Sequence, residues 1–141
     1  MSNATRPPFD PNSVASAQRA ARHHILVIDD EQPILDLLQE YLTAFGYRVT
    51  TASNAQEAKR LVEQEAPRLI ITDLQLEDTD GLQLIEQLRV LLPHTPVILL
   101  TGVLFDSQVV EENLKWKISS YISKTAPLQT LLDEIRRLIS G

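Results

Sequence analysis

The chain of 141 residues contains no cysteine, so it can form neither a disulfide framework nor a thiolate metal site. It has no apolar run near the roughly 20 residues that a membrane-spanning helix requires. Its first residues lack the apolar stretch of a secretory signal. We therefore expect a cytoplasmic domain without membrane contact.

Positive charge is scarce as well. The chain carries 13 Lys and Arg residues against 19 Asp and Glu residues, for a net charge of −6. The first 24 residues hold three arginines and one aspartate, so they contribute +2 and the remainder carries −8. A domain this acidic repels the phosphates of nucleic acid, and we expect no direct nucleic-acid binding by this chain.

Residues 1–24 hold three prolines and little apolar material. Such a composition predicts a flexible N-terminal tail, with the folded domain over residues 25–141. His23 and His24 could act as a metal-binding pair. Exposed linker histidines are the commoner arrangement, and we favour that interpretation.

From Ile25 onward, short apolar runs alternate with stretches of helical periodicity. The predicted strands cover residues 25–28, 48–51, 69–72, 97–100 and 120–122. The predicted helices cover about 33–45, 53–66, 82–92, 107–114 and 127–139. Two boundary signals stand out: Gly46 as a helix stop and Ser53-x-x-Gln56 as a capping box.

This alternation predicts an α/β fold with helices on both faces of a parallel sheet. Because crossovers are right-handed, few topologies suit so short a chain. The best fit is a flavodoxin-like, doubly wound (βα)5 arrangement with five strands in the order 2-1-3-4-5. In that order, ligands bind beyond the carboxyl ends of strands 1 and 3, where the strand order reverses.

Acidic residues follow the two strands that meet at this point. Asp29 and Asp30 follow the first strand, and Asp73 follows the third. Three neighbouring carboxylates repel one another unless a cation compensates, and Mg²⁺ suits carboxylates combined with phosphate oxygens. Taken singly, Asp29 and Asp30 could be helix N-caps and Asp73 a loop residue. Their convergence favours a functional site.

Two further polar residues end strands at the same edge of the sheet. Thr101 follows the fourth strand, and Lys124 follows the fifth. A hydroxyl and an ammonium group can both bind phosphoryl oxygens. The alternatives are a turn residue for Thr101 and a solvated surface charge for Lys124.

These features resemble the receiver domains of two-component response regulators, from Ile25 to about Ile139. The run DLQLEDTDG at residues 73–81 is similar to the family's phosphoacceptor loop, D-x-x-M/L-P-x-x-D/N-G. The ordered set at the strand ends is Asp29, Asp30, Asp73, Thr101 and Lys124. Each motif is weak alone, but the full set in this order is specific.

The resemblance implies that Asp73 takes a phosphoryl group from the phosphohistidine of a sensor histidine kinase or a histidine phosphotransfer protein. The Mg²⁺ ligands it implies are Asp29, Asp30, Asp73 and the backbone carbonyl of Gln75. Thr101 and Lys124 would hold the phosphoryl oxygens. The chain would be a signalling domain, rather than an enzyme, that assists its own phosphorylation and dephosphorylation.

The resemblance also implies a switch. The Thr101 hydroxyl would move toward the phosphoryl group, and the ring of Tyr121 would turn inward behind it. The alternative for Tyr121 is an ordinary half-buried strand tyrosine. The partner after phosphorylation would be a downstream protein or an output domain. Family members also form homodimers through the face made by the fourth helix, the fifth strand and the last helix.

The sequence departs from the family pattern at three places. Glu77 stands where the loop usually has proline. Lys117 and Ile118 replace the usual Gly-Ala before the fifth strand. Thr125 follows Lys124 in place of proline, so a cis peptide bond is not expected there.

Three other functions remain as alternatives. A pseudo-receiver would dock partners without being phosphorylated, but the complete set of site residues argues against it. A Mg²⁺-dependent phosphohydrolase resembling the haloacid dehalogenase group needs a second aspartate where Gln75 stands. A flavodoxin needs Gly, Ser or Thr donors after the first strand, where this chain has acidic residues.

Overall fold

The computed structural model describes residues 23–102 and 117–139. Its sheet consists of β1 (His24–Ile28), β2 (Arg48–Ala52), β3 (Leu69–Thr72), β4 (Val97–Thr101) and β5 (Ser120–Ser123). The described helices are α2 (Gln32–Ala44), α3 (Ala55–Gln64), α4 (Gly81–Leu91) and α6 (Leu128–Leu138). Outside the described residues lie most of the predicted tail (1–22) and the segment from Val103 to Trp116, which includes the helix predicted at 107–114.

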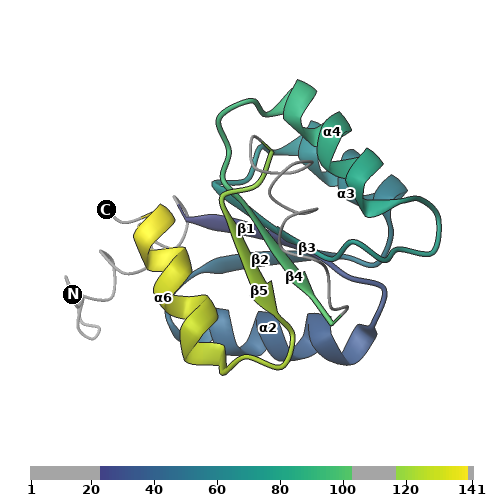
Figure 1. Ribbon diagram of the computed structural model, residues 1–141. Helices are drawn as coiled ribbons and strands as arrows, with labels where there is room; N and C mark the ends of the chain where they lie inside the picture. The colour runs from purple at the N-terminus through teal and green to yellow at the C-terminus, as the bar shows by residue number, and fades with distance from the viewer. Residues whose placement is uncertain (1–22, 103–116, 140–141) are drawn as a thin grey trace, which may run out of the picture.

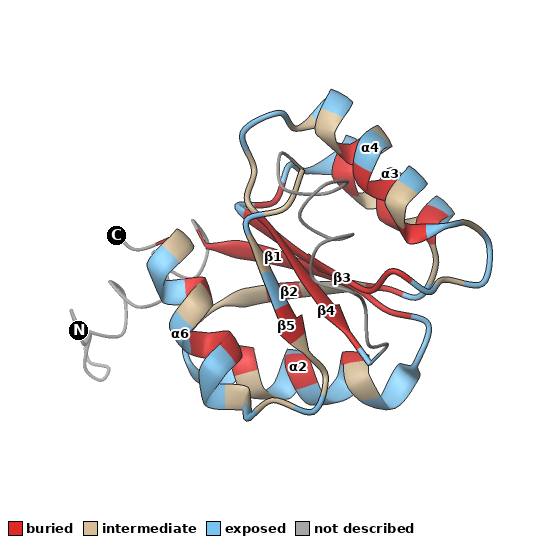
Figure 2. Cartoon of the chain, viewed as in Figure 1, coloured by how far each residue is buried: buried red, intermediate tan, exposed pale blue. Residues whose placement is uncertain are grey.

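All four strand pairs are parallel, and the order is β2-β1-β3-β4-β5 (Figure 1). This confirms the predicted flavodoxin-like topology. Because every strand runs in the same direction, all five carboxyl ends lie along one edge of the sheet. The central strands β1, β3 and β4 are buried throughout, whereas the edge strands β2 and β5 are buried only in part (Figure 2).

Helices cover both faces of the sheet, with α2 and α6 on one face and α3 and α4 on the other (Figure 1). Alternate residues of β1 divide between the two layers, because successive side chains of a strand point to opposite faces. Ile25 and Val27 pack in the core beneath α2 and α6. Leu26 and Ile28 pack in the core beneath α3 and α4.

The boundaries of α2 follow its sequence signals. Pro33 lies in the first turn, where its missing N–H has no partner to lose. Gly46 follows the C-cap with a φ of +93°, a left-handed conformation that glycine adopts without a Cβ clash. The predicted stop at Gly46 is confirmed.

The predicted cap of α3 is wrong by one residue. The N-cap is Asn54, whose side chain accepts a hydrogen bond of 2.8 Å from the backbone N–H of Glu57. The Glu57 carboxylate in turn accepts from the backbone N–H of Ser53 at 2.9 Å. Asn54 is therefore the cap, while the Glu57 carboxylate binds the residue before it, Ser53. Asparagine caps a helix as well as serine does.

The interpretation of His23 and His24 as exposed linker residues is also wrong, since both are buried. His24 is the first residue of β1, so the sheet begins one residue before the predicted boundary. Its Nε2 hydrogen-bonds the Thr50 hydroxyl of β2 at 2.8 Å. Pairing of β1 with β2 draws the histidine into the structure, and this tertiary contact has no signature in the local composition. Among the described residues, no helix has the length and apolar character needed to cross a membrane.

Candidate metal and phosphoacceptor site

Four carboxylates gather at the carboxyl ends of β1 and β3. One oxygen from each of Asp29, Asp30, Glu31 and Asp73 lies within 4.8 Å of the others. The backbone N–H of Asp73 donates to the carbonyl of Ile28 at 3.1 Å, so the hydrogen bonding between the two strands continues to the acidic residues. Asp29 and Asp73 are 2% and 4% exposed, whereas Asp30 and Glu31 face solvent.

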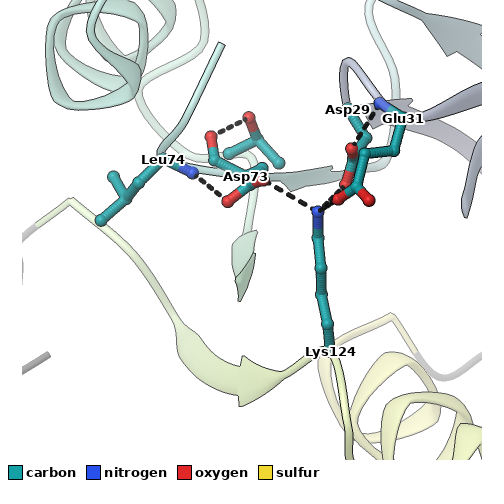
Figure 3. Close-up of polar contacts among 6 residues, drawn as sticks. Asp29, Glu31, Asp73, Leu74 and Lys124 are labelled. Atoms are coloured by element: carbon teal, nitrogen blue, oxygen red, sulfur yellow. Dashed lines mark hydrogen bonds and ion pairs between the residues drawn. The ribbon is translucent and has the colours of Figure 1, made fainter. Parts of the chain in front are cut away.

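Lys124 reaches into this group from the end of β5 (Figure 3). Its Nζ lies 2.8 Å from Asp29 Oδ2, 2.6 Å from Glu31 Oε2 and 2.9 Å from Asp73 Oδ2. The Lys124 side chain is only 11% exposed. Its backbone N–H donates to the Thr101 carbonyl at 3.0 Å, which ties the lysine to the end of β4.

The charges at this site are unbalanced. Burial raises the pKa of Asp29 above its ordinary value, and the hydrogen bond from Lys124 offsets this only in part. Burial alone would lower the pKa of Lys124. Its hydrogen bonds to the three carboxylates outweigh burial and raise that pKa above its ordinary value. The lysine is therefore an ammonium ion surrounded by more negative charge than it can neutralise.

The loop after Asp73 is closed tightly on itself. Asp73 Oδ1 accepts a hydrogen bond of 2.7 Å from the N–H of Leu74, and the N–H of Gly81 donates to the Leu74 carbonyl at 2.9 Å. A Cβ at position 81 would lie 2.4 Å from the Leu74 Cα. Only glycine permits this approach, which explains why the motif ends in glycine. An isolated antiparallel bridge joins Gln75 to Asp80 within the same loop.

Asp78 fastens this loop to a neighbouring helix. Its two carboxylate oxygens accept hydrogen bonds from the N–H groups of Ala55 and Gln56, at 2.9 and 3.1 Å. Both donors belong to the first turn of α3, where backbone N–H groups lack helical partners. These bonds lower the pKa of Asp78. Glu77, the residue in place of the family proline, is exposed.

The structure thus brings Asp29, Asp30, Asp73 and Lys124 together as predicted neighbours, with Thr101 buried at 1% exposure at the end of β4. Gln75 lies in the same loop with its side chain exposed, and the role of its carbonyl stays a prediction. Tyr121 lies on β5 and is 40% exposed, so its ring is not turned into the core. Its role as a switch also stays a prediction.

Two residues at this edge are not among the predicted site residues. Glu31 contacts Lys124, and Asp78 holds the loop. The Asp-Asp-Glu run contained the signal for Glu31, because three consecutive acidic residues after a strand all reach the same edge. For Asp78 there was no signal, because its partners lie more than twenty positions earlier in the chain.

The other departures from the family pattern are accommodated locally. The Lys117 ammonium pairs with Glu86 at 2.6 Å, and the backbone carbonyl of Lys117 accepts a hydrogen bond from Arg89 Nε at 3.1 Å. Both contacts connect the segment before β5 to α4. The N–H of Thr125 donates to the Ser123 hydroxyl at 3.1 Å. Within residues 23–102 and 117–139 there is no cis peptide bond.

The donor set suits a hard divalent cation. Mg²⁺ prefers oxygen ligands and tolerates one or two carboxylates together with water and phosphate oxygens. Here two carboxylates are buried and two are exposed, so part of the cluster is in contact with solvent.

Comparison with known proteins places the chain in a family. The family model described as "Response regulator receiver domain" matches residues 25–136. Transcriptional regulatory protein GlrR of Escherichia coli (strain K12) is 40% identical over 79 residues, which are 56% of this chain and 18% of that protein. The alkaline phosphatase synthesis transcriptional regulatory protein PhoP of Bacillus subtilis (strain 168) is 44% identical over 78 residues, 55% of this chain and 32% of that protein.

Solved structures agree with this assignment. Response regulator protein TrrA of Thermotoga maritima, in complex with Mg²⁺-BeF, superposes with a TM-score of 0.73 at 29% identity. The match covers 82% of this chain and 98% of TrrA. In contrast, the chain spans only 18% to 32% of the length of the two curated relatives.

Proposed function

The chain belongs to the response regulator receiver domain family, and from this premise we propose that Asp73 is its phosphoacceptor in a Mg²⁺-dependent reaction. The observation that carries the proposal is the contact between Asp73 Oδ2 and the ammonium of Lys124, at 2.9 Å inside a cluster of carboxylates. The same contact argues against a pseudo-receiver, which has no need of a mostly enclosed lysine beside a buried aspartate.

The chemistry is nucleophilic attack by a carboxylate. Asp73 Oδ1 is held by the N–H of Leu74, so Oδ2, which faces Lys124, is the attacking oxygen. It forms a bond to phosphorus while the bond from phosphorus to the phosphohistidine nitrogen breaks, and the leaving imidazole keeps that electron pair. The product is an aspartyl phosphate, which water later hydrolyses to restore Asp73 and release phosphate.

Asp29, Asp30, Asp73 and the carbonyl of Gln75 would hold the metal. When bound, Mg²⁺ would neutralise charge on the transferring phosphoryl group. Lys124 and Thr101 would bind phosphoryl oxygens from the strand ends opposite. Among the side chains named here, Lys124 alone carries a positive charge, so it would both attract the phosphodonor and stabilise the product.

The partners follow from the same premise. We propose a sensor histidine kinase or a histidine phosphotransfer protein as the phosphodonor, in the cytoplasm. The curated relatives are transcriptional regulatory proteins several times longer than the matched region, which supports an output domain or a downstream protein as the receiver of the signal. The acidic charge argues against direct nucleic-acid binding by this chain. We propose no further enzymatic activity beyond assistance to its own phosphorylation and dephosphorylation.

A change of state would be transmitted along β4 and β5. Thr101 is buried at the site, and Tyr121 lies exposed on the neighbouring strand, where β4 and β5 pair Leu99 with Tyr121. Phosphate contacts to Thr101 would favour the packing in which the Tyr121 ring moves inward. We also propose that the chain can form a homodimer through the face made by the helix predicted at 107–114, β5 and α6.

The test is intact-mass measurement after incubation with Mg²⁺ and acetyl phosphate. We expect one phosphoryl adduct on the wild type, and none when Mg²⁺ is removed or when Asp73 is replaced in Asp73→Asn. Titration with Mg²⁺ and beryllofluoride, a phosphoryl mimic, serves as a second assay that needs no donor. If neither an adduct nor Asp73-dependent beryllofluoride binding is found, the proposal is wrong and a docking module without phosphorylation replaces it.

A further inference from the structure

The ammonium of Lys124 has no free hydrogen for a substrate. A lysine ammonium carries three N–H donors, and three carboxylates lie within hydrogen-bonding distance of Nζ, those of Asp29, Glu31 and Asp73 (Figure 3). A phosphoryl oxygen that binds Lys124 must therefore displace one of these carboxylates or share its hydrogen.

The three carboxylates differ in how easily they can leave. Asp29 is buried, and its Oδ1 also accepts from the N–H of Glu31 at 2.9 Å. Asp73 is buried and is the proposed nucleophile. The Glu31 side chain is 59% exposed, so water replaces the lysine as its partner at little cost, as for other exposed ion pairs.

The Glu31 side chain is also not needed to hold its own segment in place. Glu31 is the N-cap of α2, but its side chain makes no capping hydrogen bond. The start of the helix is fixed by the backbone instead, since the Glu31 carbonyl accepts hydrogen bonds from the N–H groups of Ile34 and Leu35, at 3.0 and 3.2 Å. The carboxylate can therefore move away from Lys124 while the helix start stays fixed.

We propose that Glu31 is an exchangeable ligand of Lys124, which occupies the phosphoryl-binding position on the ammonium in the resting protein and leaves it when a phosphoryl group arrives. The inference rests on the proposed function of the site. Because Glu31 competes for Lys124, it weakens the binding of a phosphoryl mimic and slows phosphorylation. It is a positioning residue, since it acts through Lys124 and not on the reacting atoms.

The test compares Glu31→Gln with the wild type in beryllofluoride titrations at saturating Mg²⁺, and in the rate of adduct formation from acetyl phosphate. We expect Glu31→Gln to bind beryllofluoride about twofold to fivefold more tightly and to react faster by a similar factor, the range set by one exposed ion pair. The matched control is Glu40→Gln, which removes the same charge from an exposed position of the same helix. We expect the control to match the wild type.

Glu31→Asp separates contact from charge. It keeps the negative charge but shortens the side chain by one methylene, so it should behave like Glu31→Gln if direct contact with Lys124 matters. A metal-free measurement gives a second readout: the hydrogens of the Lys124 ammonium, followed by NMR, should exchange with water faster in Glu31→Gln than in the wild type.

Three outcomes would overturn the inference. Unchanged affinity in Glu31→Gln would mean that the carboxylate does not compete. Weaker affinity would make Glu31 a metal ligand instead. An equal gain in Glu40→Gln would reduce the effect to overall charge. In all three cases the wild type still binds the mimic, whereas a wild type that neither binds it nor forms an adduct refutes the proposed function itself.

Discussion

The two ends of the sheet both carry buried or half-buried titratable groups, but opposite charges are balanced at one end and unbalanced at the other. At the amino end, Arg48 and Glu65 pair through both carboxylate oxygens, and burial lowers the pKa of the neighbouring His24 so that it stays neutral. At the carboxyl end, a single ammonium, that of Lys124, faces three carboxylates at hydrogen-bonding distance.

The difference distinguishes a structural cluster from a binding site. A balanced pair needs nothing from outside the chain. An excess of buried negative charge costs folding free energy, and the cost is recovered only when a cation or a charged reactant binds. The comparison predicts that changes to the charged cluster and the phosphoacceptor loop at the carboxyl end alter both stability and phosphorylation, whereas changes at the amino end alter stability alone.

The largest effect is expected from Gly81→Ala. The added Cβ would lie 2.4 Å from the Leu74 backbone, so the loop that carries Asp73 must move. We expect a loss of about 2 kcal/mol or more in the free energy of unfolding. Adduct formation should slow by about tenfold or more, because small displacements of reacting groups are costly. Urea denaturation and intact-mass kinetics measure the two effects.

Two glycines provide the controls for this prediction. At Gly102, the contact that an added Cβ would make within the described residues is with the Lys124 side chain, at an ordinary 3.7 Å. At Gly46, near the amino end, it would have open space but an unfavourable φ, costing about 1 kcal/mol. We expect Gly46→Ala to lower stability without slowing phosphorylation. An equal slowing in Gly46→Ala would break the distinction between the two ends.

The second effect concerns Lys124→Met. Removing the ammonium leaves Asp29 and Asp73 buried together without a cation, and we expect a loss of about 2 kcal/mol in EDTA. Mg²⁺ should restore part of this loss, and should stabilise the variant more than it stabilises the wild type. The counterpart at the amino end is Arg48→Gln, for which we expect a much smaller loss, because its partner Glu65 is exposed, and no dependence on Mg²⁺. Urea midpoints with and without Mg²⁺ decide the matter.

The third prediction tests the anchor of the phosphoacceptor loop. Asp78→Ala removes both acceptors from the first turn of α3, and Asn54→Ala removes the other side-chain acceptor from the same turn. We expect each to cost about 1 kcal/mol. Only Asp78→Ala should also slow adduct formation, since only Asp78 belongs to the loop of Asp73. Equal phosphorylation rates in the two variants would show that the anchor is structural only.

The smallest effect is a pH dependence at the amino end. The pKa of His24 in the folded protein lies below its ordinary value of 6.5, first because of burial and then because of Arg48. Above pH 6.5 both the folded and the unfolded states are neutral at this residue. Below it the unfolded state binds a proton first, so stability is lost as the pH falls.

His24→Gln retains a partner for Thr50 but does not titrate. When the pH is lowered from 7.5 to 5.5, we expect the urea midpoint of the wild type to decrease more than that of the variant. Phosphorylation should not distinguish the two proteins beyond this effect on stability. If the urea midpoints of the two proteins changed equally with pH, His24 would not be the source of the pH dependence.

Much of the site was predictable because it depends on order along the chain. Once the strands are recognised as parallel, residues that follow them must share one edge, and Asp29, Asp73 and Lys124 meet there for that reason. The cap of α3 was misplaced because Ser53 and Asn54 are both good caps, and local sequence cannot choose between neighbours of similar propensity.

The sequence by itself determined the alternation of strands and helices, the strand order, the stop at Gly46 and the set of charged residues at one edge of the sheet. These follow from local periodicity and from the limited number of ways to wind a parallel sheet. Only the tertiary structure decided the burial of His24, the bond of Asp78 to α3 and the engagement of Lys124 by Glu31. Each depends on a distance between residues remote in the chain, which neither composition nor spacing encodes.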